Sequence, residues 1–236
     1  MKNNMTLEFT FIEGIEKLCS YRNIISISGE SGTGKTTLAL NLVDHLIGEE
    51  DSCIWVQASE LFPKKRLYQM LENCPERLEY VNESIYVIPR DSVIHSCKEQ
   101  AQIMEKIVSP TVDLPPNLSL IVIDNISHHL RFEVGQSNNI SEISRVMDEF
   151  YDYQIWPLIL FCKRNDVILI LIHEITFVPS IAKTRPFFYK LYDRIETIDL
   201  VLSNMINSTR KTLSILVASH EWKFTYNLDQ TGIVIH

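Results

Sequence analysis

The sequence is poor in cysteine, in long apolar runs and in positive charge. Its cysteines are odd in number, widely spaced and without a C-x-x-C pair, which argues against a disulfide framework or a zinc site. No apolar run approaches the length of a membrane span, and residues 1–10 lack the long apolar core of a signal peptide. We therefore expect a reducing compartment and no membrane association, with the protein cytoplasmic, or nuclear in a eukaryote. The five cysteines are Cys19, Cys53, Cys74, Cys97 and Cys162.

The shortage of positive charge bears on whether the protein binds nucleic acid. The chain has 22 Lys and Arg against 30 Asp and Glu, a formal net charge of −8. Proteins that hold DNA by themselves usually have a basic excess, because neutralising phosphates supplies much of the affinity. We expect any binding of single-stranded DNA to be weak or to need a partner. The 236 residues suffice for one α/β domain and no linker or repeat is evident, so residues 1–236 are assigned to a single domain.

Apolar, β-rich runs alternate with stretches of helical periodicity. This alternation predicts a mostly parallel sheet covered by helices on both faces. After residue 197 the pattern changes to short β-type runs separated by polar turns, which predicts an antiparallel extension at one edge of the sheet. The strands of the first part are expected at 23–28, 52–57, 85–88, 118–124 and 166–172, its helices at 35–46, 64–72, 93–108 and 139–163 (bent near Pro157), and the last strands at 198–204, 212–219, 222–227 and 231–235.

One motif has a specific chemistry. Residues 29–37, GESGTGKTT, fit the pattern G-x-x-x-x-G-K-[ST] and lie between a predicted strand and a predicted helix. Glycines let the backbone curl so that successive N–H groups converge on an anion, and the start of the helix adds its positive dipole end. The lysine reaches the β- and γ-phosphates, and the hydroxyl after it ligates magnesium. The predicted nucleotide-binding residues are Gly29, Glu30, Ser31, Gly32, Thr33, Gly34, Lys35, Thr36 and Thr37.

A carboxylate follows the apolar run LSLIVID at Asp124. Phosphate-loop proteins need an acid at the end of a neighbouring strand to hold the magnesium shell. Asp also commonly caps a following helix, which is the simpler explanation when no phosphate loop is present. Because a phosphate loop lies upstream here, we predict that Thr36 and Asp124 hold Mg²⁺ together.

With these motifs in place, the chain resembles the core ATPase domain of the RecA/RadA recombinase superfamily. Within that superfamily it is most similar to RadB-like members and to the eukaryotic recombinase paralogues, from about Gly14 to the C-terminus. The resemblance rests on GESGTGKTTLAL, IWVQASELFPKKRLYQML, LIVIDNISHHLRFEV, VILILIHEI and ILVASHEWKFTYNLDQTGI. ATPases of the circadian-clock and archaellum types share the phosphate loop and the aspartate but fit the other stretches less well.

The resemblance implies a RecA-like fold that binds ATP with Mg²⁺. Lys35, Thr36 and Asp124 match the family at the phosphate site. Arg66 falls where recombinases place an arginine that stacks on adenine, a role that suits a planar cation. The alternative for Arg66 is an ordinary solvated residue on a helix.

Two departures from the family predict weak hydrolysis. The glutamate that activates the attacking water in recombinases falls on Ser59, with Glu60 beside it as a substitute. The glutamine that senses the γ-phosphate is replaced by His173-Glu174, and a carboxylate there repels a phosphate unless metal or protonation offsets it. The catalytic candidates are therefore Lys35, Glu60 and, as a replacement base, Glu174. Hydrolysis at recombinase-like rates is the alternative, as in a DNA-stimulated or regulatory ATPase.

The partners follow from the same resemblance. We expect association with a RecA/RadA-type recombinase or another paralogue, as a homo- or hetero-oligomer in which nucleotide acts mainly as a structural switch. The family's N-terminal helical DNA-binding domain is not evident. Residues 177–191 mix cations with aromatics, which suits single-stranded DNA or, equally, packing on a partner or on the domain itself. Residues 9–11 resemble a family docking motif that here lacks its alanine.

Overall fold

The computed structural model describes residues 11–181, 183–205 and 210–236. Most of the docking motif predicted at residues 9–11 lies outside the described residues. Phe11 begins helix α1, and its ring lies 6.0 Å from that of Phe224.

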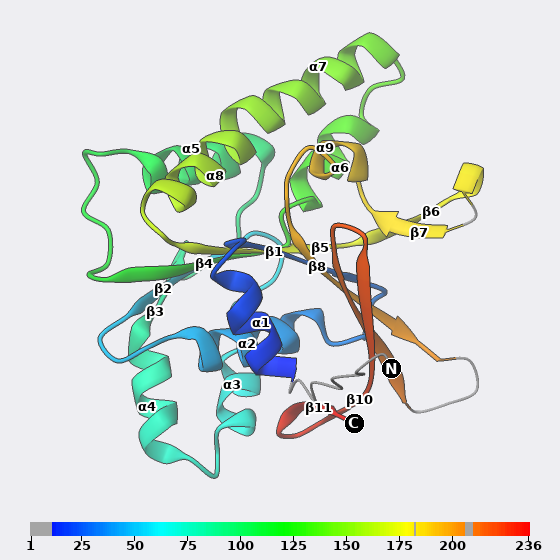
Figure 1. Cartoon of the computed structure of the whole chain (residues 1–236). Helices are drawn as coiled ribbons and strands as arrows, with labels where there is room; N and C mark the ends of the chain where they lie inside the picture. Colours follow the sequence, from blue (N-terminus) through cyan, green and yellow to red (C-terminus); the bar gives the residue numbers. More distant parts are fainter. Residues whose placement is uncertain (1–10, 182, 206–209) are drawn as a thin grey trace.

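A nine-stranded sheet forms the centre of the fold (Figure 1), in the order β11-β10-β9-β8-β1-β5-β4-β2-β3. The predicted parallel sheet with an antiparallel extension is confirmed, with one difference: β8 was predicted as part of the extension, but it pairs parallel to β1 and only its other edge pairs antiparallel to β9. The parallel strands are β1 (Ile24–Gly29), β2 (Ser52–Gln57), β3 (Ile85–Ile88), β4 (Leu118–Asp124), β5 (Ile168–His173) and β8 (Ile198–Asn204), and the extension comprises β9 (Lys211–Val217), β10 (His220–Asp229) and β11 (Gly232–Ile235).

Successive residues of the central strands point to opposite layers, as strand geometry requires. In β4, Leu120 and Val122 belong to one hydrophobic cluster, whereas Ile121 and Ile123 belong to the other. A strand buried on both faces must be apolar at every position, which explains the continuous runs in the sequence. These strands also end at a common edge, where polar residues follow them.

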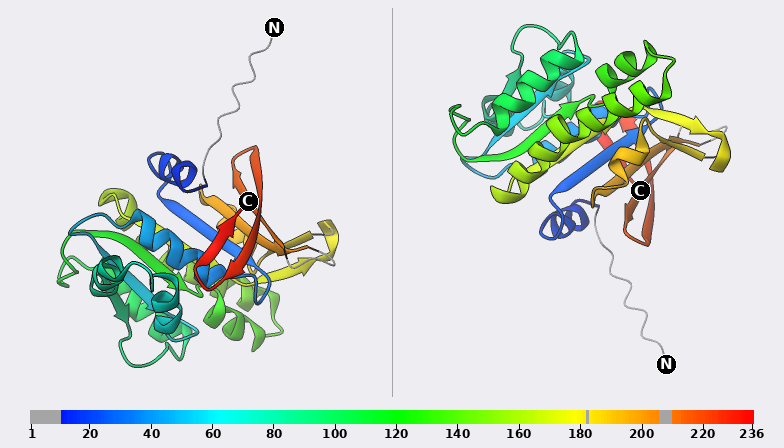
Figure 2. Two further views of the ribbon diagram at one scale, coloured as in Figure 1. Left: turned by 90° about the horizontal axis from the view of Figure 1, so that it is seen from below. Right: turned by 90° about the horizontal axis from the view of Figure 1, so that it is seen from above.

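Helices cover both faces of the sheet (Figures 1 and 2). One face packs against α1 (Phe11–Cys19), α2 (Lys35–Leu46), α3 (Lys64–Met70) and α4 (Pro75–Ser84). The opposite face packs against α5 (Cys97–Val108), α6 (His128–Gly135), α7 (Ile140–Phe150), α8 (Trp156–Arg164) and α9 (Tyr189–Tyr192). No helix within the described residues is long and apolar enough to cross a membrane.

Several predicted helix boundaries are wrong. Helix α5 begins at Cys97 rather than at 93, because the side chain of Ser96 accepts a hydrogen bond from the amide of Glu99 and caps the helix there. The helix predicted over 139–163 consists of α7, a π-helical turn η1 (Tyr151–Ile155) and α8. Pro157 lies in the first turn of α8, directly after η1.

The segment after β5 contains structure that the sequence did not predict. A small antiparallel hairpin joins β6 (Ile175–Val178) to β7 (Lys183–Pro186), with the 3₁₀ turn η2 (Pro179–Ile181) between them. In Figure 1 this hairpin projects to the side, away from the main sheet, and it begins directly at the end of β5.

Candidate nucleotide-binding site

The phosphate loop connects β1 to α2, and two of its glycines are required by geometry. A Cβ on Gly29 would lie 2.5 Å from the carbonyl oxygen of Leu202 in β8, closer than real atoms approach. Gly34 has φ +95°, a left-handed conformation that strains any other residue. The loop can therefore run tightly against β8 and then turn directly into the helix.

Lys35 folds back over this loop. Its Nζ donates to the carbonyl oxygens of Gly29 at 2.9 Å and Glu30 at 3.0 Å. Burial lowers the pKa of Lys35, whereas the nearby carboxylate of Asp124 acts in the opposite direction. The ammonium group thus lies against the carbonyls of the loop at the start of a helix, where an anion is favoured.

Thr36 and Asp124 meet although 88 residues separate them: Thr36 Oγ1 donates to Asp124 Oδ2 at 2.8 Å. Asp124 is 8% exposed. Burial raises its pKa to about 6, the hydrogen bond from Thr36 lowers it, the charge of Glu60 raises it and that of Lys35 lowers it. A hydroxyl and a carboxylate, both oxygen donors, match the preference of Mg²⁺ for hard ligands. The residues present therefore fit a magnesium ion bound beside a phosphate.

A cavity of about 730 Å³ lies over the loop. Its walls contain nearly all of the predicted nucleotide-binding residues, and Thr33 and Arg66 are the two that do not line it. Thr33 is buried behind the loop, where its Oγ1 donates to the carbonyl of Glu30 at 2.8 Å. The predicted residues on the wall are Gly29, Glu30, Ser31, Gly32, Gly34, Lys35, Thr36, Thr37, Glu60, Asp124 and Glu174.

Arg66 binds the C-terminal hairpin. Its Nη2 donates to the carbonyl of Asp229 at 2.5 Å, its Nη1 to that of Gln230 at 3.3 Å, and its Nε to Thr37 Oγ1 at 3.3 Å. The side chain therefore joins α3 and α2 to the turn between β10 and β11. Its predicted stacking on adenine remains a prediction.

The same hairpin closes over the phosphate loop. The hydroxyl of Tyr226, a fully buried residue, donates to the carbonyl of Thr33 at 2.6 Å. A Cβ on Gly34 would meet Leu228 Cδ1 at 3.0 Å. The last strands of the chain thus form part of the wall of the cavity, although nearly two hundred positions separate them from the loop in sequence.

Besides the phosphate loop and the C-terminal hairpin, the cavity wall contains Ser59, Glu60, Arg131 and Glu174. Ser59 donates its backbone N–H to the carbonyl of Asp124 at 3.1 Å, so it lies beside one of the two predicted magnesium ligands. Arg131 Nη1 forms an ion pair with Glu174 Oε2 at 2.8 Å. The predicted catalytic residues Lys35, Glu60 and Glu174 therefore share one cavity, and their roles remain predictions.

Sequence reasoning missed five residues of the wall. Arg131 was the most accessible of these to sequence reasoning, because it lies one helix beyond Asp124 within the segment IDNISHHLR. Asn125 directly follows Asp124 in the same segment, whereas the other three reach the cavity only through tertiary structure. The five are Asn125, Arg131, Ile175, Phe187 and Leu228.

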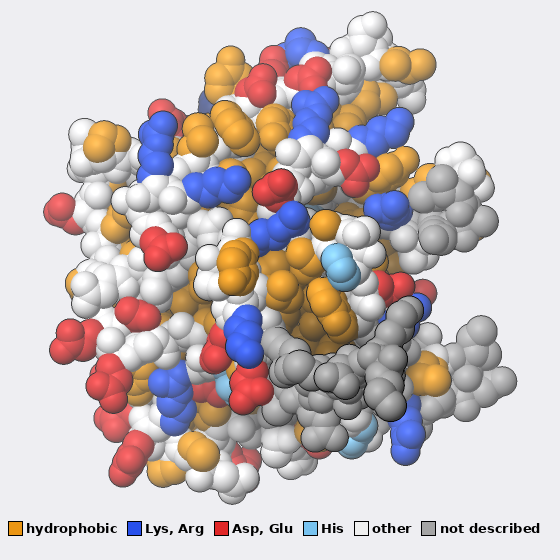
Figure 3. Space-filling model, viewed as in Figure 1, with side chains coloured by type: hydrophobic (Ala, Val, Ile, Leu, Met, Phe, Trp, Pro, Cys, Tyr) orange, Lys and Arg blue, Asp and Glu red, His pale blue; other side chains and the backbone are white. Residues whose placement is uncertain are grey.

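The predicted single-strand-binding segment, residues 177–191, lies next to this cavity. Arg185 is 4.0 Å from the carboxylate of Asp193, and Arg194 is 3.8 Å from that of Asp148. Figure 3 likewise shows Lys and Arg side chains beside Asp and Glu on the face in view. Phe187 contacts Arg131, which agrees with the alternative that part of this segment packs on the domain itself.

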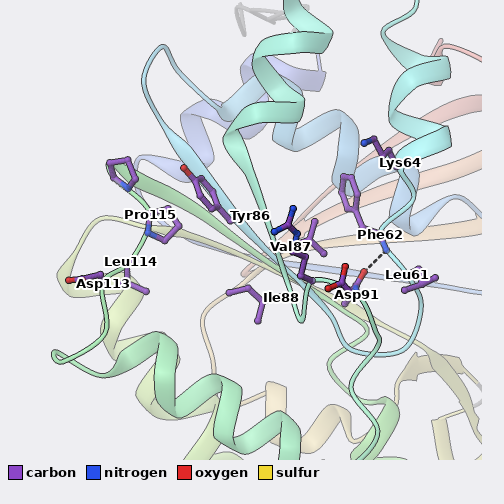
Figure 4. Close-up of a pocket in the computed structure, with 13 residues that line it drawn as sticks. Leu61, Phe62, Lys64, Tyr86, Val87, Ile88, Asp91, Asp113, Leu114 and Pro115 are labelled. Atoms are coloured by element: carbon purple, nitrogen blue, oxygen red, sulfur yellow. Dashed lines mark hydrogen bonds between the residues drawn. The ribbon is translucent and has the colours of Figure 1, made fainter.

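A larger cavity of about 1050 Å³ lies at the β3 edge of the sheet. Figure 4 shows Phe62, Tyr86 and Leu114 around it, among the labelled side chains drawn from β3 and the neighbouring loops. Its lining is mainly apolar and contains neither the phosphate loop nor Asp124. The smaller cavity is therefore the candidate nucleotide site, because only it has a cradle of amides, a lysine and metal-type oxygen donors.

Residues 17–171 match the AAA domain family. The chain is 30% identical over 166 residues to the DNA repair and recombination protein RadB of Thermococcus kodakarensis, covering 69% of this chain and 66% of the relative. It is 29% identical over 126 residues to the DNA repair protein RAD57 of Saccharomyces cerevisiae, covering 47% of this chain and 25% of the relative. The chain thus spans less than two thirds of the length of either relative.

The crystal structure of the RadB recombinase is similar with a TM-score of 0.66 at 22% identity, and the match covers 89% of both chains. At that level of identity the likeness shows a shared fold. The phosphate loop and Asp124 both lie within residues 17–171, the part of the chain that matches the family.

Proposed function

Because the chain belongs to the AAA domain family and is a RadB-like member of the RecA/RadA recombinase superfamily, we propose that it is an ATP-binding recombinase paralogue that assists homologous recombination and DNA repair. The observation that carries the ATP-binding part is the arrangement at the phosphate loop, where Lys35 Nζ lies against the carbonyls of Gly29 and Glu30. The repair role rests on the similarity to RadB and RAD57.

In this proposal each residue of the cavity has a defined task. The backbone amides of residues 29–34 and of the first turn of α2 bind the phosphates. Lys35 neutralises the β- and γ-phosphates, while Thr36 and Asp124 hold Mg²⁺. The metal, when bound, offsets the charge of the triphosphate and orients its oxygens. Thr33 supports the loop from behind.

We propose that hydrolysis is weak or absent. A general base must be free to accept a proton and must lie within reach of the attacking water. Ser59 has no basicity at neutral pH, and the carboxylate of Glu174 repels a terminal phosphate unless metal or protonation offsets its charge. Glu60 remains as a carboxylate on the cavity wall. Nucleotide would then act mainly as a structural switch.

The partner class follows from the family. We propose association with a RecA/RadA-type recombinase or another paralogue, as a homo- or hetero-oligomer, in the cytoplasm or nucleus. Direct binding of single-stranded DNA is proposed to be weak, because the net charge is −8 and Arg185 of the β6–β7 hairpin and Arg194 after α9 both lie near carboxylates.

A titration with a fluorescent ATP analogue and Mg²⁺ tests the binding proposal. Lys35→Ala should abolish saturable binding, because it removes the ammonium group from the phosphate site. Lys163→Ala is the matched control, since Lys163 is exposed at the end of α8. The absence of a saturable signal with the unmodified chain, or equal signals with both variants, would overturn the proposal.

Turnover and partners are tested separately. Release of phosphate, measured with and without single-stranded DNA, should stay far below the rate of an active recombinase, and a rate that matches one contradicts the switch. A pull-down from the source cell with ATP should recover a recombinase or paralogue that the Lys35→Ala variant does not recover. Recovery of the same partners by both proteins would show that assembly is independent of nucleotide.

A further inference from the structure

Arg131 lies where three parts of the chain meet at the nucleotide cavity. It comes from α6, Glu174 directly follows β5, and Phe187 directly follows β7. Arg131 Nη1 is 2.8 Å from Glu174 Oε2, and its guanidinium carbon lies 4.6 Å from the centre of the Phe187 ring. One cation therefore makes both an ion pair and a cation–π contact.

These contacts close the base of the β6–β7 hairpin. Ile175 pairs with Pro186 as the innermost residues of the hairpin, and the backbone N–H of Phe187 donates to the carbonyl of Glu174 at 2.9 Å. Glu174 and Phe187 are thus the two residues at which the hairpin leaves the domain. Arg131 therefore contacts both residues at the point where the hairpin projects from the domain (Figure 1).

The same three residues line the cavity that contains Lys35, Thr36 and Asp124. The charge of Glu174 acts on Lys35, in the same direction as the charges of Asp124 and Glu60. A phosphate placed beside Lys35 would therefore share the cavity with a repelling carboxylate and an attracting guanidinium. Both effects favour breaking the ion pair between Arg131 and Glu174. The phosphate competes with Glu174 for the guanidinium of Arg131, and its negative charge repels the carboxylate of Glu174.

We propose that Arg131 exchanges Glu174 for the terminal phosphate of a nucleoside triphosphate, and that this exchange releases the base of the β6–β7 hairpin. The inference rests on the proposed function, because it requires that this cavity bind a nucleotide. A diphosphate lacks the terminal group, so the ion pair persists when it binds. Arg131 is thus a residue that distinguishes triphosphate from diphosphate, and the hairpin reports the difference.

Binding constants for ADP and for a triphosphate with sulfur on its γ-phosphate, both with Mg²⁺, test the first half of the inference. Arg131→Gln should weaken triphosphate binding about tenfold, as expected for the loss of one charge-assisted contact, and leave ADP binding unchanged. Glu174→Gln should strengthen triphosphate binding several-fold, because both the competitor and the repulsion are removed. The control is Arg145→Gln, which breaks an exposed ion pair with Glu149 within α7.

Hydrogen–deuterium exchange at the Phe187 amide tests the second half. That amide is hydrogen-bonded to Glu174, so its exchange should be faster with the triphosphate than with ADP. In Arg131→Gln the two nucleotides should give the same exchange rate. In the Arg145→Gln control the difference should remain.

The outcomes separate this inference from the proposed function. If Arg131→Gln changes ADP and triphosphate binding equally or changes neither, or if Phe187 exchanges alike with both nucleotides in the unmodified chain, the exchange of partners is refuted while nucleotide binding stands. If the unmodified chain binds neither nucleotide, the proposed function fails instead. Should Arg131→Gln fail to fold, Glu174→Gln alone decides the matter, since unchanged triphosphate affinity would refute the competition.

Discussion

A single hydroxyl joins the C-terminal hairpin to the phosphate loop, and its removal tests how the site is built. Tyr226 is fully buried, and its hydroxyl donates to the carbonyl of Thr33 at 2.6 Å. Tyr226→Phe keeps the ring and creates almost no cavity, but it removes the donor from a buried carbonyl. Loss of a partner for a buried polar group costs about 1–3 kcal/mol of folding free energy. We therefore expect Tyr226→Phe to lower the free energy of unfolding by an amount in that range.

The assay is urea unfolding of the ligand-free protein, followed by circular dichroism. Tyr21→Phe is the control, because Tyr21 is 88% exposed and its hydroxyl remains in water. We expect the unfolding midpoint to fall for Tyr226→Phe with an unchanged denaturant slope, and to stay constant for the control. Nucleotide affinity should also fall several-fold, because the carbonyl of Thr33 belongs to the loop. A loss below about 0.5 kcal/mol, equal to that of the control, would refute the reasoning.

Three further predictions concern the same loop and its neighbours. Gly29→Ala places a Cβ 2.5 Å from a backbone oxygen of β8, so it should cost about 2 kcal/mol or more in unfolding free energy and weaken nucleotide binding; unchanged values for both would contradict the packing. Burial raises the pKa of Asp124 from 3.8 to about 6, so keeping this side chain ionised in the folded protein costs folding free energy. The cost is absent below about pH 4, grows as the pH rises to about 6, and reaches about 3 kcal/mol above that pH. Asp124→Asn should therefore stabilise the protein without nucleotide or magnesium, more at pH 7.5 than at pH 5 in urea unfolding, and a gain independent of pH would be inconsistent with a buried charge. Arg66→Ala removes three hydrogen bonds from a partly exposed side chain and should cost about 1 kcal/mol of stability; unchanged stability together with a large loss of ATP affinity would favour adenine stacking instead.

Much of the architecture could be predicted because buried parallel strands have a local signature. Continuous apolar runs such as LSLIVID occur where a strand is buried on both faces. Elements with weaker signatures were missed. Helix α4 is mostly polar and has few buried residues, so its sequence shows little helical periodicity. The β6–β7 hairpin lies in a segment of mixed cations and aromatics that reads equally well as a loop.

The helix predicted over 139–163 is interrupted, and the sequence indicates only part of the reason. The sequence places Pro157 where a bend is expected, and the interruption by the π-helical turn η1 comes just before it. Nothing in the apolar periodicity identifies such a turn, because its extra residue is accommodated by packing. There Gln154 hydrogen-bonds with Gln100 of α5 at 3.0 Å.

The sequence by itself determined the phosphate loop, because a glycine-rich turn followed by lysine and threonine encodes its chemistry within nine consecutive residues. It also determined that a carboxylate would end another buried strand, which the structure places one strand away from β1, beyond β5. Only the tertiary structure decided which distant residues complete the cavity. Leu228 and Tyr226 reach the loop through the β10–β11 hairpin, and Arg131 meets Glu174 through the order of the strands. Such contacts depend on the order of the strands in the sheet. No local pattern specifies that order, because the same short segments could occur in a different fold.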